Sequence, residues 1–177
     1  AACCLALVAS GANKKNVKHQ NPFMAPYATQ YGIPPFDKIT IADYLPALKA
    51  GIEQHNEEIS AIVAQRSRAD FDNTVLALDN SGELFNKVAY VYYALCESDN
   101  TPEMQKLSEQ IAPMLTAHND EIYMNEGLFQ RIKAVHDNAQ KLGLTKVQLR
   151  LTDKYYKRFV RNGALLSEAQ KDTLKDI

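Results

Sequence analysis

Glycine and proline are few in this chain and stand at a few places, which constrains the fold more than any other feature of the sequence. The 177 residues contain seven of each. Both residue types interrupt helices, glycine through its conformational freedom and proline through its missing amide hydrogen. Between them lie long stretches in which apolar residues recur every three or four positions, the spacing of one helix face. No segment shows a convincing strand pattern, so we predict an all-α fold.

The apolar spacing predicts a series of helices from residue 40 onward. The breaks between them fall at turn-forming sequences, among them Asn80-Ser81-Gly82, the run from Ser98 to Pro102, and Gly143. A capping box at Ser167 and Gln170 predicts a last helix. The expected core positions are Leu45, Leu48, Ile52, His55, Ile59 and Ile62 in the first helix, Met104, Leu107, Ile111, Met114, His118 and Ile122 in a later one, Val147, Leu151, Tyr155 and Phe159 in the penultimate one, and the cluster at residues 90–93.

Composition divides the chain into three parts. Residues 1–12, AACCLALVASGA, are apolar but too short to span a bilayer, and we interpret them as the remainder of a secretory signal. This predicts export to the periplasm or cell envelope, with a lipid anchor at Cys3 or a cytosolic N-terminus as alternatives. Residues 13–39 contain four prolines and four aromatic residues, which predicts an extended arm that packs against another surface. Residues 40–177 are expected to form an incomplete helical N-terminal domain.

Charge and cysteine content exclude several classes of protein. The formal net charge is −1, so no overall field favours nucleic acid or an anionic membrane. A basic stripe along the penultimate helix lies opposite an apolar face, and we interpret it as solvated. The three cysteines lack the spacing of a zinc knuckle or a disulfide framework, and Cys96 is expected to be a small buried residue. We predict no nucleic-acid partner and no transmembrane span. The stripe consists of Lys146, Arg150, Lys154, Lys157 and Arg161.

Two similar pentapeptides are the strongest candidates for chemistry: HNEEI at 55–59 and HNDEI at 118–122. Each places a histidine three residues before a glutamate, on one helix face, as in helical metal sites. Such sites need further inward-facing carboxylates, which the apolar seams do not supply. Because His55 and His118 occupy seam positions, we interpret them as packed neutral imidazoles, with Glu58 and Glu121 either bonding the rings or facing water.

Other catalytic signatures are missing from the sequence. No His-Glu-x-x-His zinc motif, no Gly-x-Ser-x-Gly nucleophile turn and no glycine-rich phosphate loop occurs. We therefore assign no catalytic residue, no cofactor-binding residue and no metal ligand to this chain.

Three blocks in order resemble the N-terminal part of the bacterial peptidyl-dipeptidases, or dipeptidyl carboxypeptidases, of the thimet oligopeptidase family of zinc metallopeptidases. The third block contains a helix that ends in Arg-x-Gly-Ala-x-Leu. Together they cover nearly everything from Asn21 to Ile177. The blocks are NPFMAPYATQYGIPPFDKITIADYLPALKAGIEQHNEEISAIV, APMLTAHNDEIYMNEGLFQRIKAV and LTDKYYKRFVRNGALLSEAQKDTLKDI.

The resemblance implies a helical, two-lobed parent enzyme with a deep channel, which releases dipeptides from the C-termini of short peptides. Its zinc would be held by a motif far downstream of the matched region, and a glutamate of that motif would deprotonate the zinc-bound water. The segment seen here would form channel wall, restrict access and be inactive alone. Its partners would be the remaining catalytic part of the same chain and short peptides. A free-standing helical interaction module and a metal-binding bundle are the alternatives.

Overall fold

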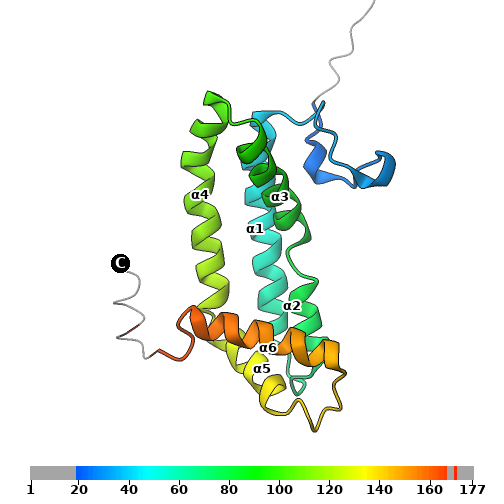
Figure 1. Ribbon diagram of the computed structural model, residues 1–177, viewed down its shortest axis with the longest axis vertical. Coiled ribbons are helices and arrows are strands. Elements are labelled where there is room, and N and C mark those ends of the chain that lie inside the picture. Colours follow the sequence, from blue (N-terminus) through cyan, green and yellow to red (C-terminus); the bar gives the residue numbers. More distant parts are fainter. Residues whose placement is uncertain (1–18, 167–169, 171–177) are drawn as a thin grey trace, which may run out of the picture.

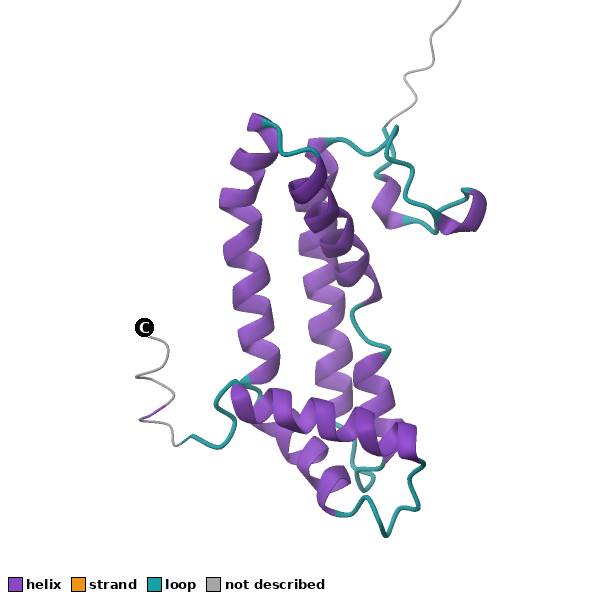
Figure 2. Ribbon diagram, viewed as in Figure 1, coloured by secondary structure: helices purple, strands orange, loops and turns teal. Residues whose placement is uncertain are grey.

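The computed structural model describes residues 19–166 and residue 170, and within these residues the regular elements are all helical (Figure 2). The predicted all-α class is confirmed. Three long helices, α1, α3 and α4, stand side by side, and α5 and α6 cross beneath one end of them (Figure 1). The elements are η1 (Pro22–Met24), η2 (Gln30–Gly32), α1 (Ile41–Val63), η3 (Phe71–Leu76), α2 (Ala77–Asp79), α3 (Glu83–Ser98), α4 (Pro102–Tyr123), α5 (Glu126–Asp137) and α6 (Lys146–Arg161).

Side-chain caps explain where several of these helices begin. The hydroxyl of Thr101 accepts from the amide of Met104, and Pro102 occupies the first helical position of α4, where no amide hydrogen is needed. Asn125 caps α5 in the same way, and Thr145 caps α6 through a reciprocal bond with Gln148. The breaks expected from the sequence are thus present. The last predicted helix lies outside the described residues apart from Gln170.

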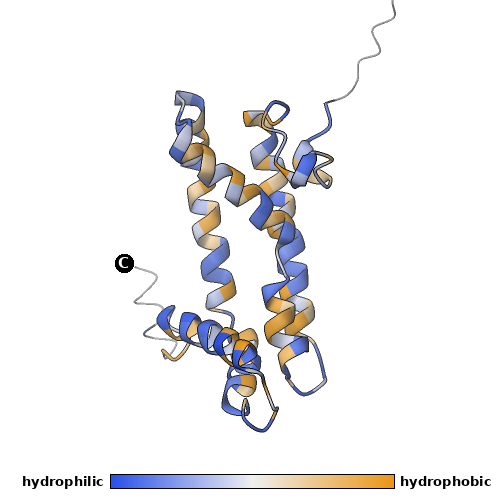
Figure 3. Ribbon diagram, turned by 45° about the vertical axis from the view of Figure 1, so that its right-hand side comes forward, coloured by the Kyte–Doolittle hydropathy of each residue, from blue (hydrophilic) through white to orange (hydrophobic). Residues whose placement is uncertain are grey.

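The core consists of two hydrophobic clusters, one above the other along the long helices. Polar residues separate the apolar stretches of α1 and α4 (Figure 3). The upper cluster is built from α1, α3, α4 and Phe23 of the arm, and the lower cluster from the ends of α1 and α4 together with η3, α2, α5 and α6. The upper cluster includes Tyr44, Leu48, Val88, Tyr92, Leu107, Ile111 and Leu115, and the lower one includes Ile59, Ile62, Val75, Ile122, Leu128, Phe129 and Phe159.

Several expected core positions were wrong by one residue. Leu45, Ile52 and Met114 are only half-buried, while Tyr44 and Leu115 are buried in the neighbouring positions. The reason is that a helix with 3.6 residues per turn allows an apolar seam to be drawn along either side of its buried face. Which side is covered depends on where the neighbouring helices lie, and this is not encoded in the spacing alone.

Two further core expectations were wrong because the residues face outward. Val147 in the first turn of α6 is 79% exposed, and of the cluster at residues 90–93 only Val91 and Tyr92 are buried. Tyr90 and Tyr93 point away from the two clusters, with 71% and 52% of their surfaces exposed. Cys96 is half-buried against the upper cluster and carries a free thiol.

The part of the arm that the structure describes is held on the helices by one aromatic ring, by one lysine, and by hydrogen bonds from His19 and Asn21 to Asp43. Phe23 is completely buried and packs edge-on against Tyr44, with ring centroids 5.1 Å apart. Lys87 of α3 donates to the carbonyls of Phe23 (2.9 Å) and Ala25 (2.5 Å), and its ammonium lies 4.1 Å from the ring centre of Tyr27. The arm therefore packs against the helices, as its aromatic content suggested.

Replacing Lys87 with methionine is expected to loosen the arm and to cost about 1–2 kcal/mol of stability. Methionine fills the space of the lysine stem but leaves two carbonyl oxygens without a charged donor and removes the cation–π contact. The loss should appear in urea denaturation and as faster amide exchange at Phe23. Lys106→Met on the exposed face of α4 is the control and should change neither quantity. Equal behaviour of the two variants would contradict this account of the arm.

Candidate functional site: a buried histidine pair

The two similar pentapeptides lie on different helices and meet at the level between the two clusters. HNEEI is part of α1 and HNDEI is part of α4, and both helices run in the same direction (Figure 1). The Nε2 of His118 lies 3.0 Å from the Nδ1 of His55, and both rings are buried. The seam positions predicted for these histidines are confirmed. Their direct hydrogen bond was not predicted.

A chain of hydrogen bonds fixes which ring nitrogens carry hydrogen. The Ser81 hydroxyl donates to the carbonyl of Leu78 (2.7 Å), so its oxygen accepts from His55 Nε2–H (3.0 Å). His55 Nδ1 then bears a lone pair and accepts from His118 Nε2–H. His55 is thus neutral, and the donors all point the same way, from α4 through α1 to the turn before α3. The remaining nitrogen, His118 Nδ1, is buried without a hydrogen-bond partner among the described residues.

Burial lowers the pKa values of both histidines. The pKa of His118 falls to about 4, chiefly because its charged form would be desolvated and secondarily because His55 lies beside it, while Glu121 acts in the opposite direction. Burial also lowers the pKa of His55, against a smaller opposing effect of Glu58. At neutral pH the pair is therefore uncharged, in agreement with the hydrogen-bond chain.

The glutamates of the two pentapeptides do not bond the rings. One carboxylate oxygen of Glu58 accepts from the backbone amide of Gly82 (2.7 Å) and the other from Gln54 (2.9 Å). Glu121 accepts a long bond from Asn56 (3.4 Å), which again connects α4 to α1. Of the two alternatives left open by the sequence, bonding to the rings is not realised, and Glu121 is exposed to water. The two glutamates stabilise the start of α3 and the contact between the helices.

Gly82 and Phe85 complete the surroundings of the pair. Gly82 has a left-handed backbone with φ of 72°, and a Cβ at this position would lie 2.6 Å from Nδ1 of His55. The ring of Phe85 lies against both imidazoles, with centroids 4.5 Å from His118 and 5.8 Å from His55. Sequence reasoning assigned Gly82 only to a break and did not connect it with His55. The available sequence signal was the Ser81-Gly82 pair directly before an apolar helix, which places a hydroxyl and a residue without a side chain at the same turn.

The described residues do not offer a set of ligands that fits a metal ion. Nowhere in residues 19–166 do three or more histidine, cysteine, aspartate or glutamate side chains gather closely enough to hold one. Of the four nitrogens in the histidine pair, three take part in the hydrogen-bond chain. The arrangement connects α1, α4 and the turn before α3, and it does not resemble a catalytic group set.

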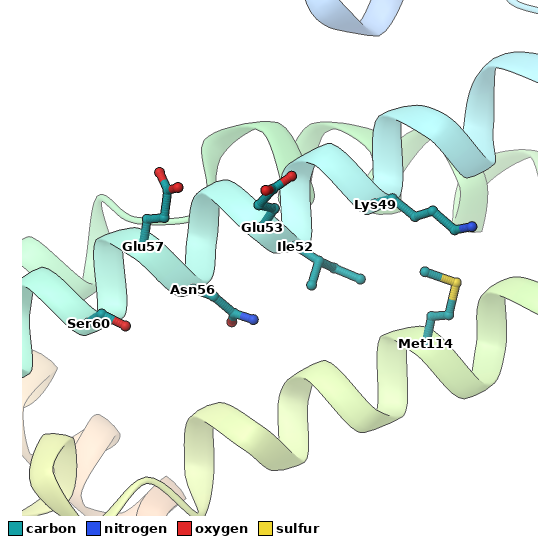
Figure 4. A pocket seen from close by; sticks show the side chains of 7 residues that line it. All are labelled: Lys49, Ile52, Glu53, Asn56, Glu57, Ser60 and Met114. Carbon is teal, nitrogen blue, oxygen red and sulfur yellow. The ribbon is translucent and has the colours of Figure 1, made fainter.

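A long open groove runs between α1 and α4 on the surface beside the pair (Figure 4). Its volume is about 670 Å³. Ile52 and Met114 point toward each other across it, and Asn56 and Ser60 also extend to the side of α4 (Figure 4). Glu53 and Glu57 extend away from α4 along its rim. The groove thus has an apolar floor and a polar edge, and no described segment covers it.

The fold and this polar layer define an all-helical segment in which the two similar pentapeptides hold α1, α4 and the start of α3 together. No profile of a known protein family matches the chain. Among curated proteins, it is 39% identical over 155 residues to the dipeptidyl carboxypeptidases of Escherichia coli K12 and Salmonella typhimurium. It is 24% identical over 156 residues to oligopeptidase A of Escherichia coli.

These matches confirm the resemblance seen in the three sequence blocks. They cover 88% of this chain for the carboxypeptidases and 86% for oligopeptidase A, but only 23% and 22% of those relatives. Over this span the chain is similar in sequence to these dipeptidyl carboxypeptidases, and it spans about a quarter of their length. None of the described helices is both long and apolar enough to cross a membrane.

Proposed function

We propose that this chain is the helical N-terminal part of a zinc peptidyl-dipeptidase, an enzyme that releases dipeptides from the C-termini of short peptides. The identity of 39% over 155 residues to two dipeptidyl carboxypeptidases carries the proposal. In this function the helices form part of the wall of a channel and limit entry to short, unfolded peptides. The reacting groups and the zinc belong to other parts of the polypeptide.

Two features of the described residues support the proposal that this segment forms part of a channel wall. The histidine pair is buried and neutral, so it strengthens the contact between α1 and α4 and is not positioned to act on a substrate. The groove between these helices and the apolar tip of the arm are left open, which suits a segment that packs against a larger body. No step of the reaction is assigned to residues of this chain.

A hybrid enzyme tests the proposal. This chain would replace the matching segment of the Escherichia coli dipeptidyl carboxypeptidase, and release of dipeptides from a short peptide would be measured. We expect the hybrid to cleave a peptide with a free C-terminus and not its amidated form, whereas this chain alone and the enzyme lacking the segment should be inactive. A folded, soluble hybrid without activity would contradict the proposal. So would hydrolysis by the isolated chain with contaminating proteases excluded.

The isolated chain is also expected to associate. Four apolar side chains of the arm are about half or more exposed and form a surface of the kind that proteins cover with a partner. At tens of micromolar, sedimentation velocity should show species larger than 20 kDa, given a chain of 19.8 kDa, and a hydrophobic dye should bind. The double substitution Tyr31→Ser and Ile33→Ser should reduce both the association and the dye binding. A strictly monomeric chain that binds no dye would contradict the expectation. The four side chains are Met24, Tyr31, Ile33 and Phe36.

A further inference from the structure

A second, more enclosed hollow lies on the other side of the histidine pair, where α6 crosses the ends of the other helices. Its volume is about 260 Å³, enough for several water molecules at about 30 Å³ each. His55 and Ser81 form part of one wall, and Tyr123 and Tyr155 lie on the side of α4 and α6. We call it the α6 hollow. It is not part of the groove in Figure 4, and it shares no lining residue with it.

The charges of the α6 hollow sum to a positive value. Lys154 and Arg158, one turn apart on α6, both line it, and Asp79 is its one carboxylate. That carboxylate accepts a hydrogen bond from the hydroxyl of Tyr155 (2.8 Å), and this bond occupies one of its oxygens. His55 contributes no charge, because its two nitrogens already take part in the hydrogen-bond chain. With two cations and one anion, the hollow favours a ligand that carries negative charge.

The polar groups that face the hollow without a partner are mainly donors. The side-chain amides of Asn86 and Asn119 make no hydrogen bond within the described part of the chain, and neither does the hydroxyl of Tyr90. Lys154 has no ion-pair partner there, and the guanidinium of Arg158 rests on the ring of Tyr123, 4.4 Å from its centre. Such stacking holds the planar guanidinium in place while leaving its N–H groups available to a planar or tetrahedral oxyanion.

We propose that the α6 hollow binds a small molecule through an oxyanion group, a carboxylate or a phosphate, held by Arg158 and Lys154 with the amides of Asn86 and Asn119 as further donors. This site is independent of the peptidase function, because its argument uses only the lining residues of the hollow. It lies next to the histidine pair, so an occupant would contact α3, α4 and α6 together and hold their ends in place.

Titration of the chain by calorimetry, with side-chain amide signals followed by NMR, tests the site. The probes are N-acetylalanine, its C-terminal amide, and inorganic phosphate. We expect at least one of the two anions to bind, to shift the amide signals of Asn86 and Asn119, and to bind about tenfold or more weakly to Arg158→Gln, since a bond to a charged group is lost. Arg150→Gln, on the same helix but outside the hollow, is the matched control and should leave affinity unchanged.

The pattern of binding separates the two sources of the oxyanion. Binding of N-acetylalanine but not phosphate identifies a carboxylate ligand, the reverse identifies a phosphorylated one, and binding of both supports a general oxyanion site. Three results would overturn the proposal: no binding of either anion at millimolar concentration, equal binding of the uncharged amide, or unchanged affinity in an Arg158→Gln variant that retains wild-type helicity.

Discussion

Lowering the pH from about 6.5 to about 4 is expected to reduce the free energy of unfolding by about 3 kcal/mol through His118 alone. The unfolded chain binds a proton on this residue near pH 6.5, whereas burial holds its pKa at about 4 in the folded chain. Between these values the unfolded state carries more protons, so stability falls as the pH falls, by about 1.4 kcal/mol per pH unit. Above pH 6.5 the residue is neutral in both states and has no effect.

His55 acts in the same direction, because burial lowers its pKa as well. Glu58 and Glu121 oppose the effect, since their charges favour protonated rings. Protonation of His118 at Nδ1 buries a charge that has no hydrogen-bond partner among the described residues. Protonation of His55 at Nδ1 places a donor against Nε2–H of His118 at 3.0 Å, so the bond between the rings cannot persist once His55 is charged. Acid should therefore separate α1 from α4 at the level between the two clusters.

His118→Gln isolates this contribution. The glutamine amide can still donate to Nδ1 of His55, as Nε2–H of His118 does, but it does not titrate between pH 4 and 7. Urea denaturation followed by circular dichroism at several pH values in this range gives the free energy of unfolding as a function of pH for the wild-type chain and for the variant. We expect the variant to lose about 3 kcal/mol less than the wild-type chain over the window. Parallel slopes would show that the histidine is not the cause of acid sensitivity.

Local sequence signals were sufficient for the helices and their ends. Thr101 with Pro102 and the break at Gly82 each act within a few residues, so the spacing of residue types predicts them. The seam that contains His55 was also visible, because burial on one face imposes a period of three or four residues. These features follow from interactions within one helix.

Contacts between helices could not be predicted in this way. That His55 bonds His118, and not Glu58, depends on α1 and α4 running in parallel at a matched level, with α3 between them in the chain. The likeness of HNEEI and HNDEI was a signal of equivalent positions, but a likeness of five residues does not say that two segments meet. The α6 hollow brings Asp79 to Tyr155 across 76 positions of sequence, beyond the reach of any periodicity.

The two hydrophobic clusters and the polar layer between them suggest a structural role for the buried histidine pair. Apolar contacts alone permit one helix to slide along another with little change in energy, whereas a chain of buried hydrogen bonds is satisfied at a single level. The bonds from His118 to His55 and from His55 to Ser81 thus fix the height of α4, α1 and the start of α3 relative to one another. In the proposed function, such a fixed register would suit a segment that forms channel wall against the rest of the enzyme.

Gly82 lies directly against the ring of His55, and Gly82→Ala is expected to cost about 3 kcal/mol of stability. About 1 kcal/mol comes from placing a Cβ on a left-handed backbone with φ of 72°. The remainder arises because the new methyl would lie 2.6 Å from Nδ1 of His55, so the ring must move and break its bonds to His118 and Ser81, at about 1 kcal/mol each.

Gly143→Ala is the matched control for the backbone component. Gly143 has φ of 65°, but a Cβ at that position meets no atom within 4 Å. The two variants share the conformational cost, and they differ only in the collision with the histidine. We expect Gly143→Ala to lose about 1 kcal/mol in urea denaturation and Gly82→Ala to lose about three times as much. Equal losses would mean that His55 moves aside freely, and then the histidine pair would not be what holds α1, α3 and α4 in register.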